Sequence, residues 1–154
     1  MKIALASDER TFLTDFLIRD LQWRGHEVLR FGAIAENDPE GDWLLSTRNA
    51  AAAVARGDAS EGIVCCWTGT GASIAANKVV GIRAALCGDA ETAKGVRVWN
   101  HADVLVLSLR STSEAIAKEI LDAWYAWYAT PYSDDEWNRK QIERIGNADR
   151  LRLP

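Results

Sequence analysis

A thiol at the end of an apolar run, followed by a glycine-rich turn, is the stretch of sequence best suited to chemistry. Residues 62–78 read GIVCCWTGTGASIAANK, so Cys66 ends a strand-like run and residues 68–71 (TGTG) precede a helix of small residues. Glycines let a ligand approach the backbone, and the unpaired N–H groups of a helix start favour a thiolate. Such a thiolate can take a proton from carbon while the N–H groups hold the resulting oxyanion.

Other readings of this stretch stay open. Side chains alternate along a strand, so Cys65 and Cys66 should face opposite ways, and a buried cysteine is usually a small hydrophobic residue. A nucleophilic cysteine would need a histidine base, but His26 is expected at the opposite end of its strand and His101 is the only other histidine. The glycine spacing matches neither the nucleotide P-loop nor the dinucleotide motif.

Apolar runs that alternate with helical patterns predict five β-α units and one extra helix. The expected strands are 2–6, 27–31, 62–66, 82–87 and 103–108, and the expected helices are 11–24, 44–56, one from 72, 89–98, one that ends before Pro131, and a last one closed by Gly146. Ser111-x-x-Glu114 and Ser133-x-x-Glu136 have capping-box spacing. This pattern predicts one α/β domain over residues 1–154, a five-stranded parallel sheet covered on both faces.

Ligands of such sheets bind beyond the carboxyl ends of the strands. The loops after Ala6, Phe31, Cys66, Cys87 and Ser108 should therefore share one rim. Three polar residues near this rim each have two possible roles. Asp8 either caps the first helix or is a site carboxylate, Asn100 either ends a helix or binds a hydroxylated ligand, and Arg110 is either solvated or meets an anion.

Composition narrows the class of protein. The 154 residues carry a net charge of −4 and no long basic run, which argues against a nucleic-acid partner. Three cysteines cannot all pair and lack metal-ligand spacing, so we expect a reducing cytoplasm and no metal. No apolar run approaches the length of a membrane span, and the apolar part of MKIALASDER is too short for a signal peptide.

Residues 66–87, CWTGTGASIAANKVVGIRAALC, resemble the signature of the ribose-5-phosphate isomerase B and galactose-6-phosphate isomerase family, typically C-G-T-G-x-G-x-S-I-A-A-N-K…G-I-R-A. The resemblance extends over nearly the whole chain. It implies a Rossmann-like three-layer fold, a homodimer or dimer of dimers, and no metal or organic cofactor. The implied reaction interconverts an aldose and a ketose sugar or sugar phosphate through a cis-enediolate.

The resemblance also implies roles for individual residues. Cys66 matches the base that moves a proton between C1 and C2, and Thr68 matches a residue for ring opening or proton handling. The backbone at Gly69, Thr70, Gly71 and Ser73 matches the anion hole. Asp8 and Asn100 match sugar-binding positions, and Trp43 stands where a tyrosine lines the site.

Departures from the family pattern concentrate on phosphate binding. Glu9 and Trp99 stand where the family has histidines, and Trp137 and Gln141 stand where it has phosphate-binding arginines. Arg110 is the one family phosphate ligand retained. Each charge-assisted contact to phosphate contributes about 1.5–3 kcal/mol, so their loss predicts an altered substrate, such as a sugar without the terminal phosphate. Glu9 and Trp99 suit a neutral sugar through hydrogen bonding and stacking.

Two other classes remain. The chain could be a non-catalytic sugar-binding subunit or one member of a hetero-oligomer. It could also be an interaction protein whose partner surface is formed by Trp124, Trp127 and Trp137. We expect these three tryptophans to belong instead to a subunit interface and a site shared between subunits.

Overall fold

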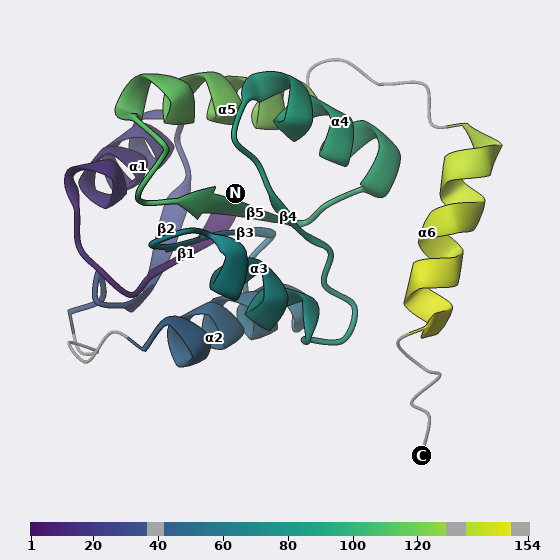
Figure 1. Cartoon of the computed structure of the whole chain (residues 1–154), viewed down its shortest axis with the longest axis horizontal. Coiled ribbons are helices and arrows are strands. Elements are labelled where there is room, and N and C mark those ends of the chain that lie inside the picture. The colour runs from purple at the N-terminus through teal and green to yellow at the C-terminus, as the bar shows by residue number, and fades with distance from the viewer. Residues whose placement is uncertain (37–41, 129–134, 149–154) are drawn as a thin grey trace.

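The computed structural model describes residues 1–36, 42–128 and 135–148, which fold as a three-layer α/β/α domain around a parallel sheet (Figure 1). The strands are β1 (Lys2–Ser7), β2 (Glu27–Gly32), β3 (Glu61–Cys66), β4 (Ala84–Leu86) and β5 (Val104–Ser108). The helices are α1 (Phe12–Trp23), α2 (Trp43–Ala55), α3 (Thr70–Asn77), α4 (Ala90–Asn100), α5 (Glu114–Ala126) and α6 (Glu136–Ala148). The five strands lie in the order β2-β1-β3-β5-β4, and all the pairings are parallel. The predicted fold is confirmed.

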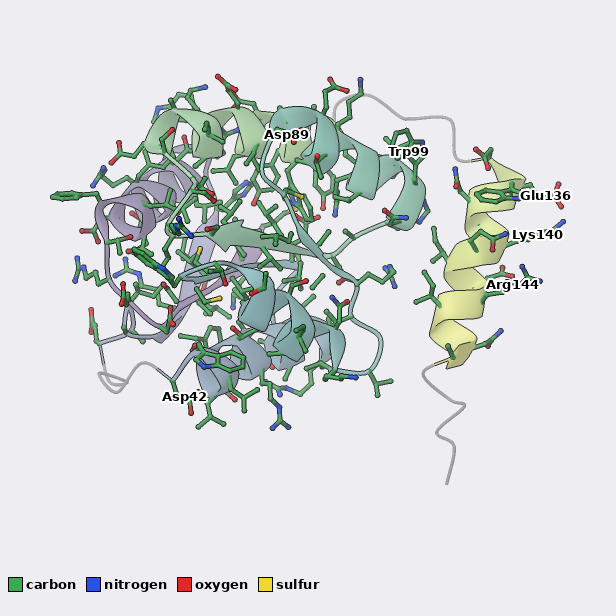
Figure 2. All side chains as sticks on the ribbon, viewed as in Figure 1. Asp42, Asp89, Trp99, Glu136, Lys140 and Arg144 are labelled. Atoms are coloured by element: carbon green, nitrogen blue, oxygen red, sulfur yellow. The ribbon has the colours of Figure 1, made fainter. Side chains whose placement is uncertain are left out.

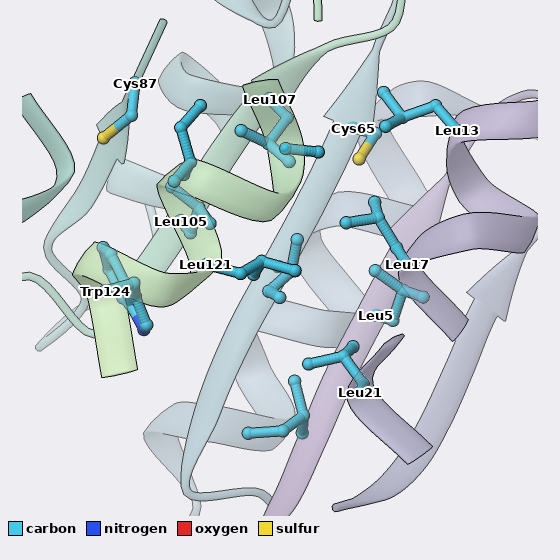
Figure 3. Packing of buried hydrophobic residues seen from close by; sticks show 14 of the residues in the cluster. Leu5, Leu13, Leu17, Leu21, Cys65, Cys87, Leu105, Leu107, Leu121 and Trp124 are labelled. Atoms are coloured by element: carbon cyan, nitrogen blue, oxygen red, sulfur yellow. The ribbon is translucent and has the colours of Figure 1, made fainter. Parts of the chain in front are cut away.

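Each face of the sheet has its own core. Leucines from β1, β5, α1 and α5 fill the face under α1, α4 and α5, and Cys65 points into this layer (Figure 3). Alanines of α2 and α3 cover the opposite face, which includes Cys66. The two adjacent thiols thus face opposite ways, as alternation along a strand requires. Alanine-rich α2 and α3 can approach the sheet closely because their side chains are small.

Two predicted helix boundaries are wrong. Ser113, not Ser111, caps α5: its Oγ accepts from the Ile116 N–H at 3.2 Å. Ser111 lies in the turn after β5, where its N–H donates to Ser108 Oγ. Gly146 does not close the last helix, because α6 continues through it to Ala148. Ser133 lies outside the described residues.

The fourth strand is shorter than the predicted 82–87. It runs only from Ala84 to Leu86 and pairs on one side, with β5, at the edge of the sheet. The Arg83 N–H donates to the Asp103 carboxylate at 2.8 Å instead of joining the strand ladder. The glycine-loop helix begins earlier than residue 72, at Thr70.

The expectation that Trp124 lies in a subunit interface is wrong. Its side chain is fully buried in the α1/α4/α5 layer, and its Nε1 donates to Glu61 Oε2 at 2.8 Å. Trp127 is half-buried and packs against the His101 ring, whereas Trp137 on α6 is exposed. The hydrophobic period of α5 places Trp124 with Leu121 and Ile120, and that pattern decides its burial.

Helix α6 stands beside the domain, next to α4, rather than on the sheet (Figure 1). The two core clusters found in the described residues contain none of its side chains. In the described part of the chain, no helix combines the length and apolar character needed to cross a bilayer.

Candidate active site

The carboxyl ends of β1 and β3 define the point where the sheet changes direction. The chain moves from β1 outward to β2 and then crosses back to β3 on the other side of β1. Ser7 pairs in register with Cys65, so Asp8 and Cys66 leave the sheet at the same level on neighbouring strands. Ligand sites of open α/β sheets lie in the crevice at this switch point.

Cys66 is the last residue of β3, at this switch point. Only 6% of the residue is exposed, and it packs with Ala6 of β1 and Ala72 of the first turn of α3. Burial, with the neighbouring Cys66 and Asp8, raises the pKa of Cys65 far above the ordinary thiol range. Burial also raises the pKa of Cys87 to about 12, and nearby Asp89 adds to the shift. Cys65 and Cys87 therefore keep their protons. Cys66 differs from these two cysteines in its position, at the carboxyl end of β3 next to the start of α3.

The glycine turn that follows Cys66 is shaped by Gly69. Its φ is +77°, a conformation that favours glycine, and a Cβ there would also lie 2.5 Å from Leu86 Cδ1, which would have to move aside. Gly69 occupies the N-cap of α3, and among the described residues no side chain caps that helix. The first backbone N–H groups of α3, from Thr70 to Ala72, are thus left for an anionic ligand. Thr68 and Thr70 hydroxyls form a hydrogen bond at 2.7 Å beside them.

Hydrogen bonds tie this turn to the end of β5. The Leu109 N–H donates to the Cys66 carbonyl at 3.0 Å, and the Arg110 N–H donates to the Trp67 carbonyl at 2.9 Å. Ser108 Oγ also donates to the Trp67 carbonyl, at 3.0 Å. The exposed Arg110 is therefore fixed at the same rim as Cys66, as the order of strands predicts.

Asp8 is not a helix cap. Thr11 caps α1 and forms a capping box with Thr14. Asp8 Oδ1 is buried and has no hydrogen-bond partner among the described residues. Burial raises the pKa of the Asp8 carboxyl against a lowering backbone hydrogen bond, and the nearby Glu9 carboxylate adds to the rise. The reading of Asp8 as a site carboxylate is favoured, and the exposed Glu9 stands beside it.

Asp8→Asn is expected to stabilise the fold at pH 7 while it lowers activity. Because the folded-state pKa is raised, the contribution of Asp8 to stability is largest below pH 4 and is lost as pH rises through that pKa. The gain in the variant should stay under about 1 kcal/mol, since solvent screens this half-exposed group. Urea unfolding from pH 4 to 8 measures it.

Asp89→Asn is the matched control with the opposite sign. Hydrogen bonds from Thr92 lower the pKa of Asp89 at the N-cap of α4. The stability advantage of its carboxylate should therefore shrink as pH falls. A gain in Asp8→Asn that grew toward low pH would contradict the assignment of Asp8 as a desolvated carboxylate.

Trp43 reaches the glycine turn from α2. The Asp42 carboxylate caps α2 by accepting from the Leu44 N–H at 2.7 Å, which fixes Trp43 as the first helical residue. Its ring lies over Gly71, where an added Cβ would be 3.1 Å from Trp43 Cε3. Ser73 follows in α3, where its N–H bonds the Gly69 carbonyl. The structure thus brings Trp43 together with residues 66–73.

Trp99 and Asn100 lie at the amino ends of the strands, opposite the carboxyl rim that carries Cys66. They end α4, which runs back from the rim, and β5 begins only four residues after Asn100. The five residues of β5 separate the two ends by about 16 Å at about 3.3 Å per residue. Within one chain these two residues do not join Cys66. The order of elements in the sequence carried this signal, because the helix that follows a parallel strand returns across the sheet and ends opposite the rim.

Two residues near these groups had no role predicted from the sequence. Trp67, directly after Cys66, is 58% exposed at the rim. Gly95 lies under the ring of Trp99 on α4, and the i, i+4 spacing of the two residues was the available signal. Among the described residues, no three His, Cys, Asp or Glu side chains converge as metal ligands, and the three cysteines are unpaired.

The arrangement combines a thiol, a ring of backbone donors and a carboxylate at one switch point. A profile of the family described as Ribose/Galactose Isomerase matches residues 3–145. The chain belongs to this family. Ribose-5-phosphate isomerase B of Escherichia coli K12 is 37% identical to this chain over 124 residues that cover 80% of this chain and 82% of that protein. A D-erythrulose-4-phosphate isomerase of Pectobacterium atrosepticum is 38% identical over 77% of this chain and 75% of that protein.

Solved structures of the ribose/galactose isomerase family agree with the fold. Ribose-5-phosphate isomerase B of Clostridium thermocellum superposes with a TM-score of 0.85 at 33% identity, over 97% of this chain and 98% of that chain. Membership makes this chain an isomerase, and the different sugars named for its relatives show that the family fold serves more than one substrate.

Proposed function

We propose that the chain interconverts an aldose and a ketose through a cis-enediolate, with Cys66 as the base. The observation that carries this proposal is the place of Cys66, at the carboxyl end of β3 beneath the uncapped start of α3. A helix N-terminus stabilises both a thiolate and an enediolate oxygen. Catalysis needs no cofactor in this scheme.

Every proton that moves in this reaction comes from the sugar or from Cys66, so no other reactant is needed. The Cys66 thiolate removes the proton from C2 of the open-chain aldose, and the C–H electron pair forms the C1–C2 double bond. The negative charge moves to O1, which the N–H groups of Thr70, Gly71 and Ala72 are placed to hold. The Gly69 and Ser73 N–H groups, which the resemblance also assigned to the anion hole, instead donate to the Cys66 and Gly69 carbonyls. A proton passes from O2 to O1, and the Cys66 thiol then protonates C1. The Thr68 hydroxyl, already bonded to Thr70, is the candidate for handling the O2–O1 proton.

A complete site requires a second copy of the chain. Within one chain, Trp99 and Asn100 lie at the amino ends of the strands and Cys66 lies at the carboxyl ends. Trp99 and Asn100 can therefore meet only the Cys66 of another copy. The position of α6 beside the domain, with Trp137 exposed, supports a contribution of the same kind from the tail. We therefore propose a homodimer or a dimer of dimers that contains composite sites.

We expect this site to hold phosphate poorly. Arg110 is the arginine that the resemblance assigns to phosphate. Arg10, beside Glu9 in the loop after β1, pairs with Asp15 at 2.9 Å, and the exposed Glu9 carboxylate repels a dianion. Turnover of D-ribose 5-phosphate should therefore fall below that of a suitable unphosphorylated pentose or hexose, in a coupled assay of kcat/KM across both sets. A kcat/KM for ribose 5-phosphate equal to that of the best unphosphorylated sugar would contradict the predicted weak binding of phosphate.

Arg110→Met sharpens the comparison. It should lower kcat/KM for a phosphorylated sugar about 10-fold or more, the effect of one charge-assisted contact, and leave the unphosphorylated sugar unaffected. Equal losses on both sugars would show that Arg110 does not meet a phosphate. Arg19→Met, on the exposed side of α1, is the control for general charge effects.

Exchange of solvent deuterium into the sugar tests the reaction itself. An isomerase that returns a proton to carbon from a thiol incorporates deuterium at C1 or C2, which NMR of the recovered sugar detects. A non-catalytic sugar-binding subunit gives no incorporation, so its absence for every pentose and hexose tried would favour that second candidate.

A further inference from the structure

Trp99 rests against a residue that has no side chain. A Cβ built on Gly95 would lie 2.7 Å from Cζ3 and 3.0 Å from Cε3 of the Trp99 indole. Real Cβ atoms do not approach other atoms so closely, so this position of the ring depends on glycine. Helical side chains lean toward the residue four positions earlier, and Gly95 is that residue for Trp99.

A second indole lies against a glycine at the rim, in a less tight contact. A Cβ on Gly71 would lie 3.1 Å from both Cε3 and Cζ3 of Trp43. The Asp42 cap fixes the backbone of Trp43, and its ring lies against Gly71 beside the glycine turn. Both seated tryptophans are at positions already assigned to the proposed site, one at each end of the strands.

The seated rings remain open to a ligand. Trp99 is 59% exposed and Trp43 is 45% exposed, so neither ring is a core residue. Figure 2 shows Trp99 at the end of α4 that lies toward α6, on the outside of the domain. Glycine inside a helix is unfavourable compared with alanine, and Gly95 is central in α4. The packing gained by an exposed ring does not explain that choice, whereas a fixed orientation does.

We propose that Gly95 is a positioning residue that holds the Trp99 indole as a platform for the apolar C–H face of a neutral sugar ring, with Trp43 seated on Gly71 as a second wall. The inference rests on the proposed function, because Trp99 reaches the Cys66 rim only from another copy. Aromatic rings present a negative face that attracts C–H groups, and a fixed indole loses little freedom when a sugar stacks on it.

Gly95→Ala tests whether Gly95 positions the Trp99 ring, and Gly146→Ala is its matched control. The added methyl group must displace the exposed Trp99 ring, which can swing away, so the fold should survive. Gly146→Ala makes the same change inside helix α6, where nothing lies within 4 Å. Binding of D-ribose and D-galactose is measured by tryptophan fluorescence in the Cys66→Ala background, in which no turnover interferes.

We expect Gly95→Ala to weaken binding of at least one of these sugars about 2- to 10-fold, the range of one aromatic contact, and Gly146→Ala to leave it unchanged. In a Trp99→Ala background, Gly95→Ala should have no further effect, because its target is gone. With Cys66 restored, Gly95→Ala should raise KM and leave kcat unchanged. A structural role of Gly95 would give none of this dependence on Trp99.

Several outcomes would overturn the proposal. These are equal binding by the Gly95→Ala and Gly146→Ala proteins, an effect that persists without Trp99, binding of neither sugar, or a change of assembly in Gly95→Ala by sedimentation. The last would make Trp99 an interface contact instead. Failure of the proposed reaction is distinguishable, because it would appear as absent deuterium exchange while the binding differences persisted.

Discussion

Replacing Cys66 with alanine is expected to lower the rate of deuterium exchange into the sugar by about 10²- to 10⁴-fold, the contribution of a positioned general base. The reason is geometric: no other ionisable sulfur lies on the α2/α3 face among the described residues, since Cys65 and Cys87 both pack in the opposite core. Exchange is followed by NMR at saturating sugar, and circular dichroism verifies that the variant is folded.

Cys65→Ala is the matched control for this prediction. It removes a neighbouring sulfur that points into the α1/α5 core (Figure 3). Loss of one buried heavy atom should reduce the free energy of unfolding by about 1 kcal/mol, as deletion of a methylene does, without slowing exchange. If Cys65→Ala abolished exchange and Cys66→Ala did not, the assignment of the base would be reversed.

Arg97→Met is expected to lower the free energy of unfolding by about 3–5 kcal/mol, the effect of stranding one partner of a buried ion pair. Arg97 Nη2 lies 2.7 Å from Glu61 Oε1, and both side chains are almost fully buried. Arg97 Nη1 also donates to the Ala102 carbonyl at 2.6 Å, and its Cζ lies 4.7 Å from the Trp124 ring centroid. Urea unfolding at pH 7 measures the loss.

The other hydrogen-bond donors to Glu61 limit the loss of stability in Arg97→Met, but they do not replace the positive charge of the guanidinium. Trp124 Nε1 and the Tyr128 hydroxyl both donate to its carboxylate. Burial and the bond to Glu61 raise the pKa of Tyr128 to about 12, so the hydroxyl keeps the proton it donates. Adding Glu61→Gln to Arg97→Met should recover much of the lost stability, because the stranded charge is removed.

Arg56→Met provides the exposed counterpart. Its partner Asp58 lies 2.9 Å away, but both side chains are more than half exposed, so the loss should be under about 1 kcal/mol. Equal losses in Arg56→Met and Arg97→Met would contradict the buried network. Because Arg97 lies two residues before Trp99, the network also fixes the end of α4 that carries the proposed sugar platform.

Local patterns in the sequence were sufficient for the sheet and for one half of the site. Apolar runs and helical periods predict the strand and helix order, because those periods follow from backbone geometry. The rule that parallel strands share one carboxyl edge then places Asp8, Cys66 and Arg110 together, and the structure has them at that edge. The alternation of Cys65 and Cys66 is a consequence of the same local geometry.

Boundaries and the burial of aromatic residues were harder to predict. Ser111 has capping-box spacing, but its N–H is already bonded to Ser108, so the helix begins two residues later. Trp124 resembled an interface residue by composition, yet the buried Glu61 carboxylate supplies an acceptor for its indole N–H. Such choices depend on residues distant in the chain, which no local window contains.

The sequence by itself determined the family, the parallel α/β architecture and the thiol at the mouth of a glycine turn, since each follows from short-range spacing. Only the tertiary structure decided that Asp8 is a desolvated carboxylate rather than a cap, that Trp124 is a core residue, and that Gly71 and Gly95 lie against two indole rings. The physical reason is that burial and the contact of a ring with a bare Cα are set by packing between elements.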